Sequence, residues 1–337
     1  MSKYLKKATR PFEIDPRMNV ADLVEAMEGT AFQAKNLATA ADIWKRMLKG
    51  ETTVFLGLSG AMVPAGMRPV IRYLIEKRMI DCLVSTGANL FHDAHETLGN
   101  FHWQGSSTVD DMDLKRHRVN RIYDVFACEE EFNRTDKYIA SFASTLSKTR
   151  PYTTREFLYL LGGALASDAK AGGMLTAAHK AKVPVYCPAI GDSSIAISLL
   201  VDHHDAKIVF DAVADIEEMA RIVMDAKATG VIYVGGGTPK NFIQQTEVTA
   251  PFLGRATGGH AYAIQITCDS PQWGGLSGCT FEEGQSWGKI SEGAFKVTVY
   301  SDATIAFPVI VTAVAQRAAS IIKKRRLPSM RVFGKRH

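Results

Sequence analysis

The sequence has no closely spaced cysteine pair, no long apolar run and no apolar segment after its basic start, and each absence excludes a class of protein. Five cysteines are scattered without a CxxC motif, so we expect a reducing compartment and no disulfide framework. No stretch approaches the roughly 18 apolar residues of a membrane-spanning helix. The basic start precedes no apolar segment, so no secretory signal is expected. We therefore expect a cytoplasmic protein without a membrane partner.

The net charge of +5 over 337 residues is modest and comes largely from the C-terminal end. Basic residues cluster at Lys323–Arg326 and at Arg331–His337. No aromatic residue interleaves with them before Phe333, and no nucleic-acid-binding motif surrounds them. We therefore expect no nucleic-acid partner and a solvated basic tail over residues 325–337.

Short β-rich runs alternate with amphipathic helical stretches through most of the chain. This alternation predicts βαβ units, and the nearly continuous apolar strands predict a mostly parallel α/β sheet with helices on both faces. We expect one domain over residues 1–337, with an N-terminal helical extension at 1–45. The predicted strands are 52–57, 79–85, 183–187, 207–210, 230–234, 262–266 and 296–300, and the predicted helices are 69–77, 164–182, 216–229 and 307–324.

Three predicted strand ends carry small or glycine-rich turns, namely Gly57–Ala61, Ser85–Asn89 and Gly235–Lys240. Ligands of open α/β sheets bind at the carboxyl ends of strands, and glycines let backbone N–H groups approach a phosphate. The three turns together predict a nucleotide site, although none is a GxGxxG motif. Gly284–Ile290 is not a P-loop, because one residue is missing between its glycines and Ile290 stands where Ser or Thr is needed.

No metal site is expected. His92 with His95, and the cluster His203–Asp205, lack the cysteine partners or HExxH frame of a zinc site. The acidic run Asp110–Asp113 belongs to the polar stretch Gly105–Arg118, which we interpret as a surface excursion.

Lys289 is the candidate nucleophile. It lies beside Trp287 and two glycines, Gly284 and Gly288, where its amine can be packed in a partly closed, apolar site. A neutral lysine amine there can form a Schiff base with a carbonyl or imine carbon. The alternative is an exposed lysine at the end of a loop, and these residues alone leave both interpretations open.

The segment Ser286–Ile290 resembles the nucleophile motif of the deoxyhypusine synthase family. The resemblance covers roughly residues 52–315 and implies a Rossmann-like, doubly wound fold and a homotetramer with active sites at subunit interfaces. The further matching segments, in the family's order, are Phe55-Leu56-Gly57, Ile71-Arg72-Tyr73-Leu74, Asn120-Arg121-Ile122, Pro188-Ala189, Gly235-Gly236-Gly237, Ser301-Asp302-Ala303 and Phe307-Pro308.

The resemblance also implies NAD as cofactor and covalent catalysis. In that family NAD takes a hydride from the carbon beside a polyamine's secondary amine. The lysine, here Lys289, then holds the aminobutyl group as an imine until an acceptor amine displaces it, and the retained NADH reduces the product. The residues implied to contact NAD are Gly60, Ala61, Met62, Val63, Pro64, Thr86, Gly87, Ala88, His92, Asp192, Gly236, Cys268, Asp269, Asp302 and Ala303.

The substrate pocket departs from the family's pattern. Three of its acids are replaced by apolar residues, and each lost carboxylate removes a charge-assisted hydrogen bond worth about 1.5–3 kcal/mol. The aligned residues are Phe91, Ile197 and Leu276 for the lost acids, His92 for an acid that contacts the cofactor, Asn241 for a histidine, and Glu283 and Trp287 for retained substrate residues.

We therefore predict an NAD-dependent transferase that moves an aminoalkyl group from a small-molecule amine donor through a Lys289 imine to an acceptor amine, with an altered donor, an altered acceptor or both. Three alternatives remain open. One is a homospermidine synthase-type enzyme that makes a free polyamine. The second is a non-catalytic NAD-binding protein, and the third is an NAD-dependent amine dehydrogenase.

Overall fold

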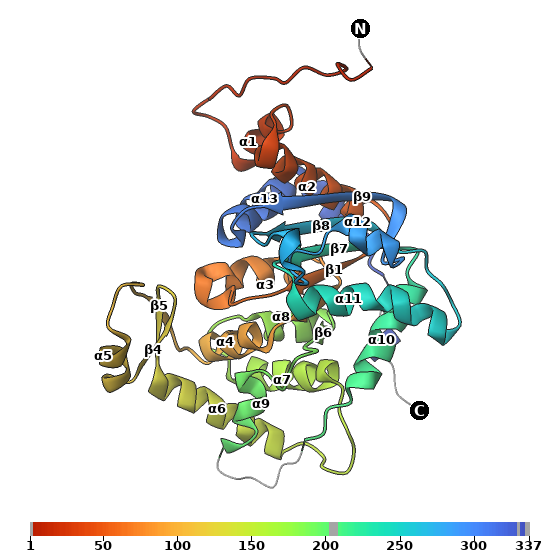
Figure 1. The fold of residues 1–337 in the computed structure, drawn as a ribbon. Coiled ribbons are helices and arrows are strands. Elements are labelled where there is room, and N and C mark those ends of the chain that lie inside the picture. Colours follow the sequence, from red (N-terminus) through yellow and green to blue (C-terminus); the bar gives the residue numbers. More distant parts are fainter. Residues whose placement is uncertain (1–2, 202–207, 329–330, 334–337) are drawn as a thin grey trace.

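The structure is a computed structural model that describes residues 3–201, 208–328 and 331–333. A six-stranded sheet of order β6-β2-β1-β7-β8-β9 forms its centre, and every neighbouring pair of strands is parallel (Figure 1). In chain order the strands run 3-2-1-4-5-6, which is the order of a doubly wound Rossmann sheet. This confirms the predicted fold class. The strands are β1 (Thr52–Leu58), β2 (Cys82–Ser85), β6 (Val185–Tyr186), β7 (Ala228–Val234), β8 (His260–Thr267) and β9 (Ile290–Tyr300).

Helices cover both faces of this sheet because successive strand side chains point to opposite sides. In β7, Ile232 packs in the cluster that contains Trp44 and Phe307, whereas Val231 packs in the cluster that contains Ile243. The first face is covered by α2 (Phe32–Lys49), α3 (Arg68–Glu76) and α13 (Ala303–Arg317), and the second by α10 (Ala212–Asp225), α11 (Gly237–Thr249) and α12 (Phe281–Ser286).

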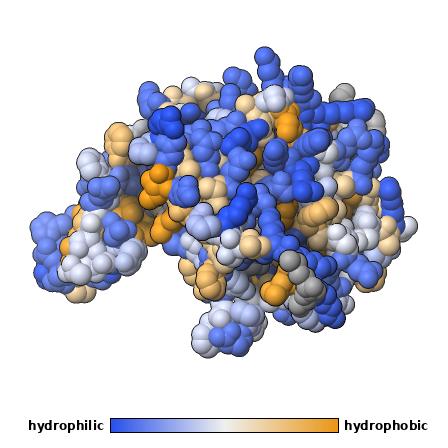
Figure 2. Space-filling model, turned by 90° about the horizontal axis from the view of Figure 1, so that it is seen from above, coloured by the Kyte–Doolittle hydropathy of each residue, from blue (hydrophilic) through white to orange (hydrophobic). Residues whose placement is uncertain are grey.

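A small lobe projects from this body at the lower left of Figure 1, and Figure 2 shows hydrophobic side chains gathered where it meets the body. Its antiparallel sheet has the order β3-β5-β4, and the polar stretch 105–118 lies mostly exposed on it, which confirms the predicted surface excursion. The lobe contains β3 (His102–Gln104), α5 (Asp111–Arg116), β4 (Val119–Ile122) and β5 (Val125–Cys128).

The remaining helices complete the body. Residues 3–19 contain no helix or strand, and α2 packs on β8 and β9, so part of the predicted N-terminal extension belongs to the sheet's cover. The single-domain organisation stays a prediction. These helices are α1 (Val20–Met27), α4 (Gly87–Thr97), α6 (Glu129–Ser144), α7 (Thr154–Asp168), α8 (Met174–Ala181), α9 (Ser194–Ser198) and α14 (Ala319–Lys324), with the short helices η1 (Val63–Met67), η3 (Ala250–Leu253), η4 (Pro271–Trp273) and η5 (Arg331–Phe333).

Three predicted elements are wrong in part. The strand at 207–210 is reduced to a single bridge between Phe210 and Tyr152, and Lys207 lies outside the described residues. The helix at 164–182 is two helices, because the chain at Gly173 approaches Thr97 so closely that a Cβ atom would lie 2.2 Å from its hydroxyl oxygen. The helix at 216–229 ends at Asp225, since β7 begins at Ala228.

The C-terminal end also differs from its prediction. The last long helix begins at Ala303 and is interrupted at Ala318. Arg325 is not solvated: its side chain is 1% exposed and forms an ion pair with the fully buried Asp81. Its guanidinium also donates to the carbonyl oxygens of Thr52 and Arg78, so the tail is fastened to the amino end of the sheet. Across the described ranges, no helix is long and apolar enough to cross a membrane.

Candidate active site

Two glycine turns meet at the point where the strand order reverses. Gly60 follows β1 and Gly235 follows β7, with φ angles of 69° and 74° that favour glycine. The hydroxyl of Ser59 donates a hydrogen bond to the carbonyl of Gly236, which ties the two turns together. The N-terminus of α11 begins at Gly237 in the second turn. The positive end of the α11 dipole makes this place suited to a phosphate group, and the N–H of Gly237 donates to Oγ of Ser277 over 3.1 Å.

The third predicted turn, Thr86–Ala88, is bonded to the Gly60 turn. We call the three turns, which follow β1, β2 and β7, the cradle. The Thr86 hydroxyl donates to the Gly60 carbonyl over 2.9 Å. The buried Asn89 donates from its side-chain nitrogen to the same carbonyl over 3.0 Å and accepts from the N–H of Val63 over 3.1 Å. Asn89 therefore fixes the whole 60–64 turn. The sequence places Asn89 in the third turn but gives its side chain no role, because two of its partners, Gly60 and Val63, lie 29 and 26 residues away.

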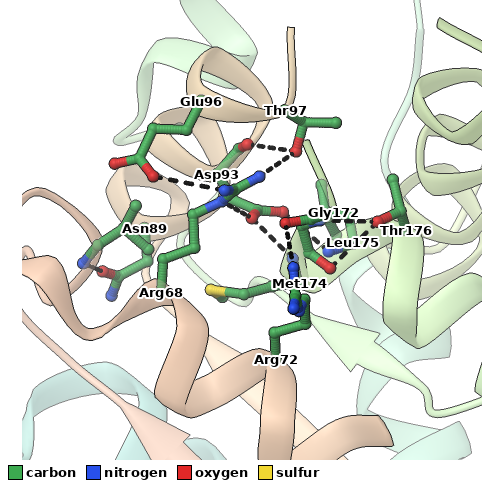
Figure 3. A network of polar contacts seen from close by, with 12 residues as sticks. Arg68, Arg72, Asn89, Asp93, Glu96, Thr97, Gly172, Met174, Leu175 and Thr176 are labelled. Atoms are coloured by element: carbon green, nitrogen blue, oxygen red, sulfur yellow. Dashed lines mark hydrogen bonds and ion pairs between the residues drawn. The ribbon is translucent and has the colours of Figure 1, made fainter. Parts of the chain in front are cut away.

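A buried ion pair holds α4 through Asp93, in the second half of the helix (Figure 3). Arg68 donates to Asp93 over 2.8 Å, and Asp93 accepts from the N–H groups of Met174 and Leu175 at the start of α8, over 2.7 and 2.8 Å. Burial raises the pKa of Asp93, and Arg68 together with the two N–H groups opposes that rise. The arrangement joins α3, α4 and α8 behind the cradle.

His92, a predicted cofactor contact, lies at the end of a chain of polar contacts. Arg68 lies 3.4 Å from Glu96, Glu96 is 2.7 Å from Nδ1 of His102, and Nε2 of His102 is 2.9 Å from Nδ1 of His92. Because the Glu96 carboxylate only accepts hydrogen bonds, Nδ1 of His102 carries a proton and donates it to Glu96. In the neutral His102 ring Nε2 then accepts, so Nδ1 of His92 carries the proton of the second hydrogen bond. Burial lowers the pKa of His92 to about 3. The neutral ring thus keeps its Nε2 as an acceptor.

The other predicted cofactor residues follow strands at the same edge. Asp192 comes after β6, and Cys268 and Asp269 come directly after β8, all three exposed. Asp302 caps α13 after β9, where its carboxylate accepts from the N–H of Thr304 over 2.8 Å, and Ala303 is the first residue of the helix. The structure therefore collects the predicted set along the carboxyl edge of the sheet.

Lys289 lies at the opposite, amino end of β9, and its side chain extends toward α11. Its Nζ is 3.5 Å from Oδ1 of Asn241 and 5.3 Å from the centre of the Trp287 ring. Together they border a hollow of about 170 Å³. Four of the six predicted substrate residues therefore meet Lys289. The lining residues are Lys240, Asn241, Gln244, Gly274, Gly275, Leu276, Cys279, Glu283, Gly284, Trp287 and Lys289.

Two expectations about this hollow are not met within one chain. Trp287 is 66% exposed, so it does not close an apolar pocket around Lys289. Phe91 is buried against Phe132 with 5.5 Å between ring centres, and Ile197 is exposed on α9. Neither Phe91 nor Ile197 lines the hollow. The two residues lie instead on the neighbouring helices α4 and α9.

Lys240 and Gln265 connect the cradle to the hollow, and sequence reasoning gave neither a role. The buried Lys240 donates to Oε1 of Gln265 over 2.9 Å and to the carbonyl of Cys279 over 2.5 Å. Burial lowers the pKa of Lys240 to about 8. Gln265 in turn donates to the carbonyls of Gly235 and Ser277 over 2.9 and 2.7 Å. The sequence signal that could have drawn attention to Gln265 is that it is the one glutamine in the otherwise apolar predicted strand 262–266.

The residues 202–207, which contain the histidines 203 and 204, lie outside the described part of the chain. Within the described part, no group of three or more His, Cys, Asp or Glu side chains is arranged to hold a metal ion. His92, His95 and His102 lie close together, and both ring nitrogens of His102 and the Nδ1 atoms of His92 and His95 contact one another, Glu96 or Thr135.

Comparison with known proteins identifies the family. The family model described as deoxyhypusine synthase matches residues 22–314. The chain is 50% identical over 323 residues to "Probable deoxyhypusine synthase 2" of Methanosarcina mazei, covering 95% of this chain and 92% of that protein. It is 53% identical to the protein of the same name from Archaeoglobus fulgidus over 84% of this chain and 94% of that protein. The crystal structure of a deoxyhypusine synthase homologue from Entamoeba histolytica shares the fold, with a TM-score of 0.65 at 20% identity over 90% of this chain and 96% of that one. The chain belongs to the deoxyhypusine synthase family.

Proposed function

We propose that this protein is an NAD-dependent transferase that carries an aminoalkyl group from an amine donor to an amine acceptor as an imine on Lys289. The observation that carries the proposal is the hollow itself. It places a lysine amine beside Asn241 and Glu283, and the loop 268–280 links it to the glycine turns at the sheet's carboxyl edge.

Two features of the cradle support NAD as the cofactor. A Cβ atom added at Gly60 would meet nothing within 4 Å, so the turn borders open space. The N-termini of α4 and α11 both begin at this edge and favour the negative charge of a pyrophosphate. NAD, when bound, would accept a hydride and return it. The residues proposed to hold it are those of the 60–64 and 86–88 turns, with His92, Asp192, Gly236, Cys268, Asp269, Asp302 and Ala303.

The side chains of the hollow have separate proposed roles. The Lys289 amine adds to the imine carbon of the oxidised donor, and the donor's amine leaves with a proton, so that a new carbon–nitrogen double bond joins the carried group to Nζ. Asn241 orients Nζ through its side-chain oxygen. Glu283 pairs with one ammonium group of the substrate. The acceptor amine then reverses the exchange and frees Lys289.

The charges of the hollow favour a donor with fewer ammonium groups than a polyamine. The lining residues all belong to the described part of the chain. Among them, one side chain is acidic, Glu283, and two are basic, Lys240 and Lys289. A second or third ammonium placed here would have no partner, and an unpaired buried charge is costly. We propose that the amine substrates carry a single charge where they contact this hollow.

Leu276→Asp tests this assignment directly. The added carboxylate would offer a second ammonium a partner, so we expect the ratio of the affinity for spermidine to the affinity for a monoamine, measured by calorimetry, to rise about tenfold. Leu276→Asn is the matched control, because it adds polarity without charge. A ratio that changes equally in both variants would contradict the charge argument.

Gly236→Ala tests the cradle. The added Cβ would lie 2.3 Å from Cα of Ser277, so the turn or the loop must move. We expect NAD binding, measured by calorimetry, to weaken at least tenfold, because a displacement of this size misplaces the backbone N–H groups. Gly293→Ala is the control, since its Cβ would meet nothing within 4 Å. Equal NAD affinity in the two variants would remove the turn from the site.

We further propose a homotetramer in which a second subunit closes the hollow. The exposed face of Trp287 beside Lys289 supports this part of the proposal, because a large aromatic side chain at the mouth of a reactive site is suited to burial against another surface. A dry site would also protect the Lys289 imine from hydrolysis.

A further inference from the structure

A second hollow is lined by α11 residues and shares one lining residue, Asn241, with the Lys289 hollow. It measures about 190 Å³ and lies between α10 and α11. Asn241 lines both hollows, and its side-chain oxygen lies 3.5 Å from Nζ of Lys289. We call it the α10–α11 groove. Its lining residues are Ile216, Met219, Thr238, Asn241, Phe242, Gln245, Thr246 and Thr249.

The lining of the α10–α11 groove carries no charge. One wall is apolar, formed by Ile216 and Met219 of α10 together with Phe242. The other wall presents hydroxyl and amide groups of α11, and two of its threonine hydroxyls already donate to carbonyl oxygens of their own helix. An ammonium group in this groove would lose water without gaining a carboxylate. A hydrocarbon chain would instead gain about 0.8 kcal/mol for each methylene that it buries.

We infer that the α10–α11 groove binds the uncharged chain of a monoamine whose single amino group faces Asn241 and Glu283 beside Lys289. The inference rests on the proposed function, because the amine meant is the one that leaves or attacks the group carried by Lys289. It assigns the substrate class as alkyl or hydroxyalkyl monoamines. A diamine of the same length would place its far ammonium between Ile216 and Phe242.

The test compares n-hexylamine with 1,6-diaminohexane, which match in length and differ in the second charge. Calorimetry on the full chain with NAD present is expected to give hexylamine at least tenfold tighter binding than the diamine. Each methylene from butylamine to hexylamine is expected to improve affinity about fourfold. Equal or tighter binding of the diamine, or binding that does not depend on chain length, would overturn the inference.

Ile216→Glu locates the effect in the α10–α11 groove. Ile216 lines the groove and is 39% exposed, so the variant can fold with its carboxylate at the groove wall. We expect it to weaken hexylamine and to favour the diamine. Val213→Glu is the matched control, because Val213 lies on the same helix, is 74% exposed and does not line the groove. The same shift in both variants would overturn the assignment.

Borohydride trapping separates this inference from the proposed function. An adduct on Lys289 together with no preference between the two amines would leave the transferase proposal standing and overturn the groove assignment. A clear preference for hexylamine without any adduct would support the groove and count against Lys289 as the nucleophile.

Discussion

Lys289→Arg is expected to reduce amine transfer by at least about a thousandfold, because it removes the proposed nucleophile and keeps its charge. Guanidinium stays protonated at any pH that the protein survives and cannot add to an imine carbon. Lys289 is half-buried at the start of β9, and its backbone N–H and carbonyl groups bond to Gly284 and His260, so the fold does not depend on its side chain.

The rate of transfer is to be measured by mass spectrometry of the product amine, with NAD and a panel of amine donors. Lys227→Arg serves as the control, since Lys227 is exposed and pairs with Glu51 far from the hollow. Transfer that survives in Lys289→Arg at the rate of the control would refute covalent catalysis at this residue.

Arg325→Ala is expected to lower the free energy of unfolding by about 3–5 kcal/mol, because it leaves the Asp81 carboxylate buried without its cationic partner. Both carboxylate oxygens of Asp81 contact the Arg325 guanidinium, at 3.0 and 2.5 Å, and both side chains are nearly inaccessible to water. Arg78 also reaches Asp81, but at 3.4 Å, so it replaces only part of the lost interaction.

Arg326→Ala is the matched control for that measurement. Arg326 is the next residue, its side chain is 84% exposed, and it pairs with Glu51 across 3.1 Å at the surface. Such a pair contributes about 0–1 kcal/mol. Urea unfolding of the two variants should therefore differ by several kcal/mol. Equal losses would mean that the C-terminal segment does not anchor the sheet in solution.

The sequence predicted the sheet because its signals are local. The strands from Thr52 to Leu58 and from Ala228 to Val234 are apolar on both faces, as a doubly covered parallel strand requires. The turns after these strands were also predicted from local signals, because Gly60 and Gly235 have backbone conformations that favour glycine. Lys289 was found through its motif, which is also a local signal.

The contacts that the sequence did not reveal join residues far apart in the chain. Arg325 looked like part of a solvated basic tail, and only the fold shows that it reaches Asp81, 244 residues away. Lys240 and Gln265 are 25 residues apart, and neither belongs to a pattern that marks a buried pair. Phe210 lies in a run with a strand-like composition, but it finds only one bridge partner, Tyr152.

The Lys289 hollow is more open than the sequence predicted, because its closure also depends on contacts that are not local in the sequence. Trp287 was expected to help exclude water, and its exposure in one chain depends on what packs against it, which local composition does not encode. Leu276 and Glu283 line the hollow, and α12, which carries Glu283, packs against β9. Phe91 and Ile197 were assigned by alignment with the family and lie on other helices.

The most direct measurement is a mass spectrum of the protein incubated with NAD and a panel of amines and then reduced with borohydride. We expect a stable adduct on Lys289 that depends on NAD and is absent from Lys289→Arg, with a mass that identifies the carried group. No adduct on Lys289 despite tight NAD binding would contradict the account and favour a protein that binds the cofactor without this chemistry.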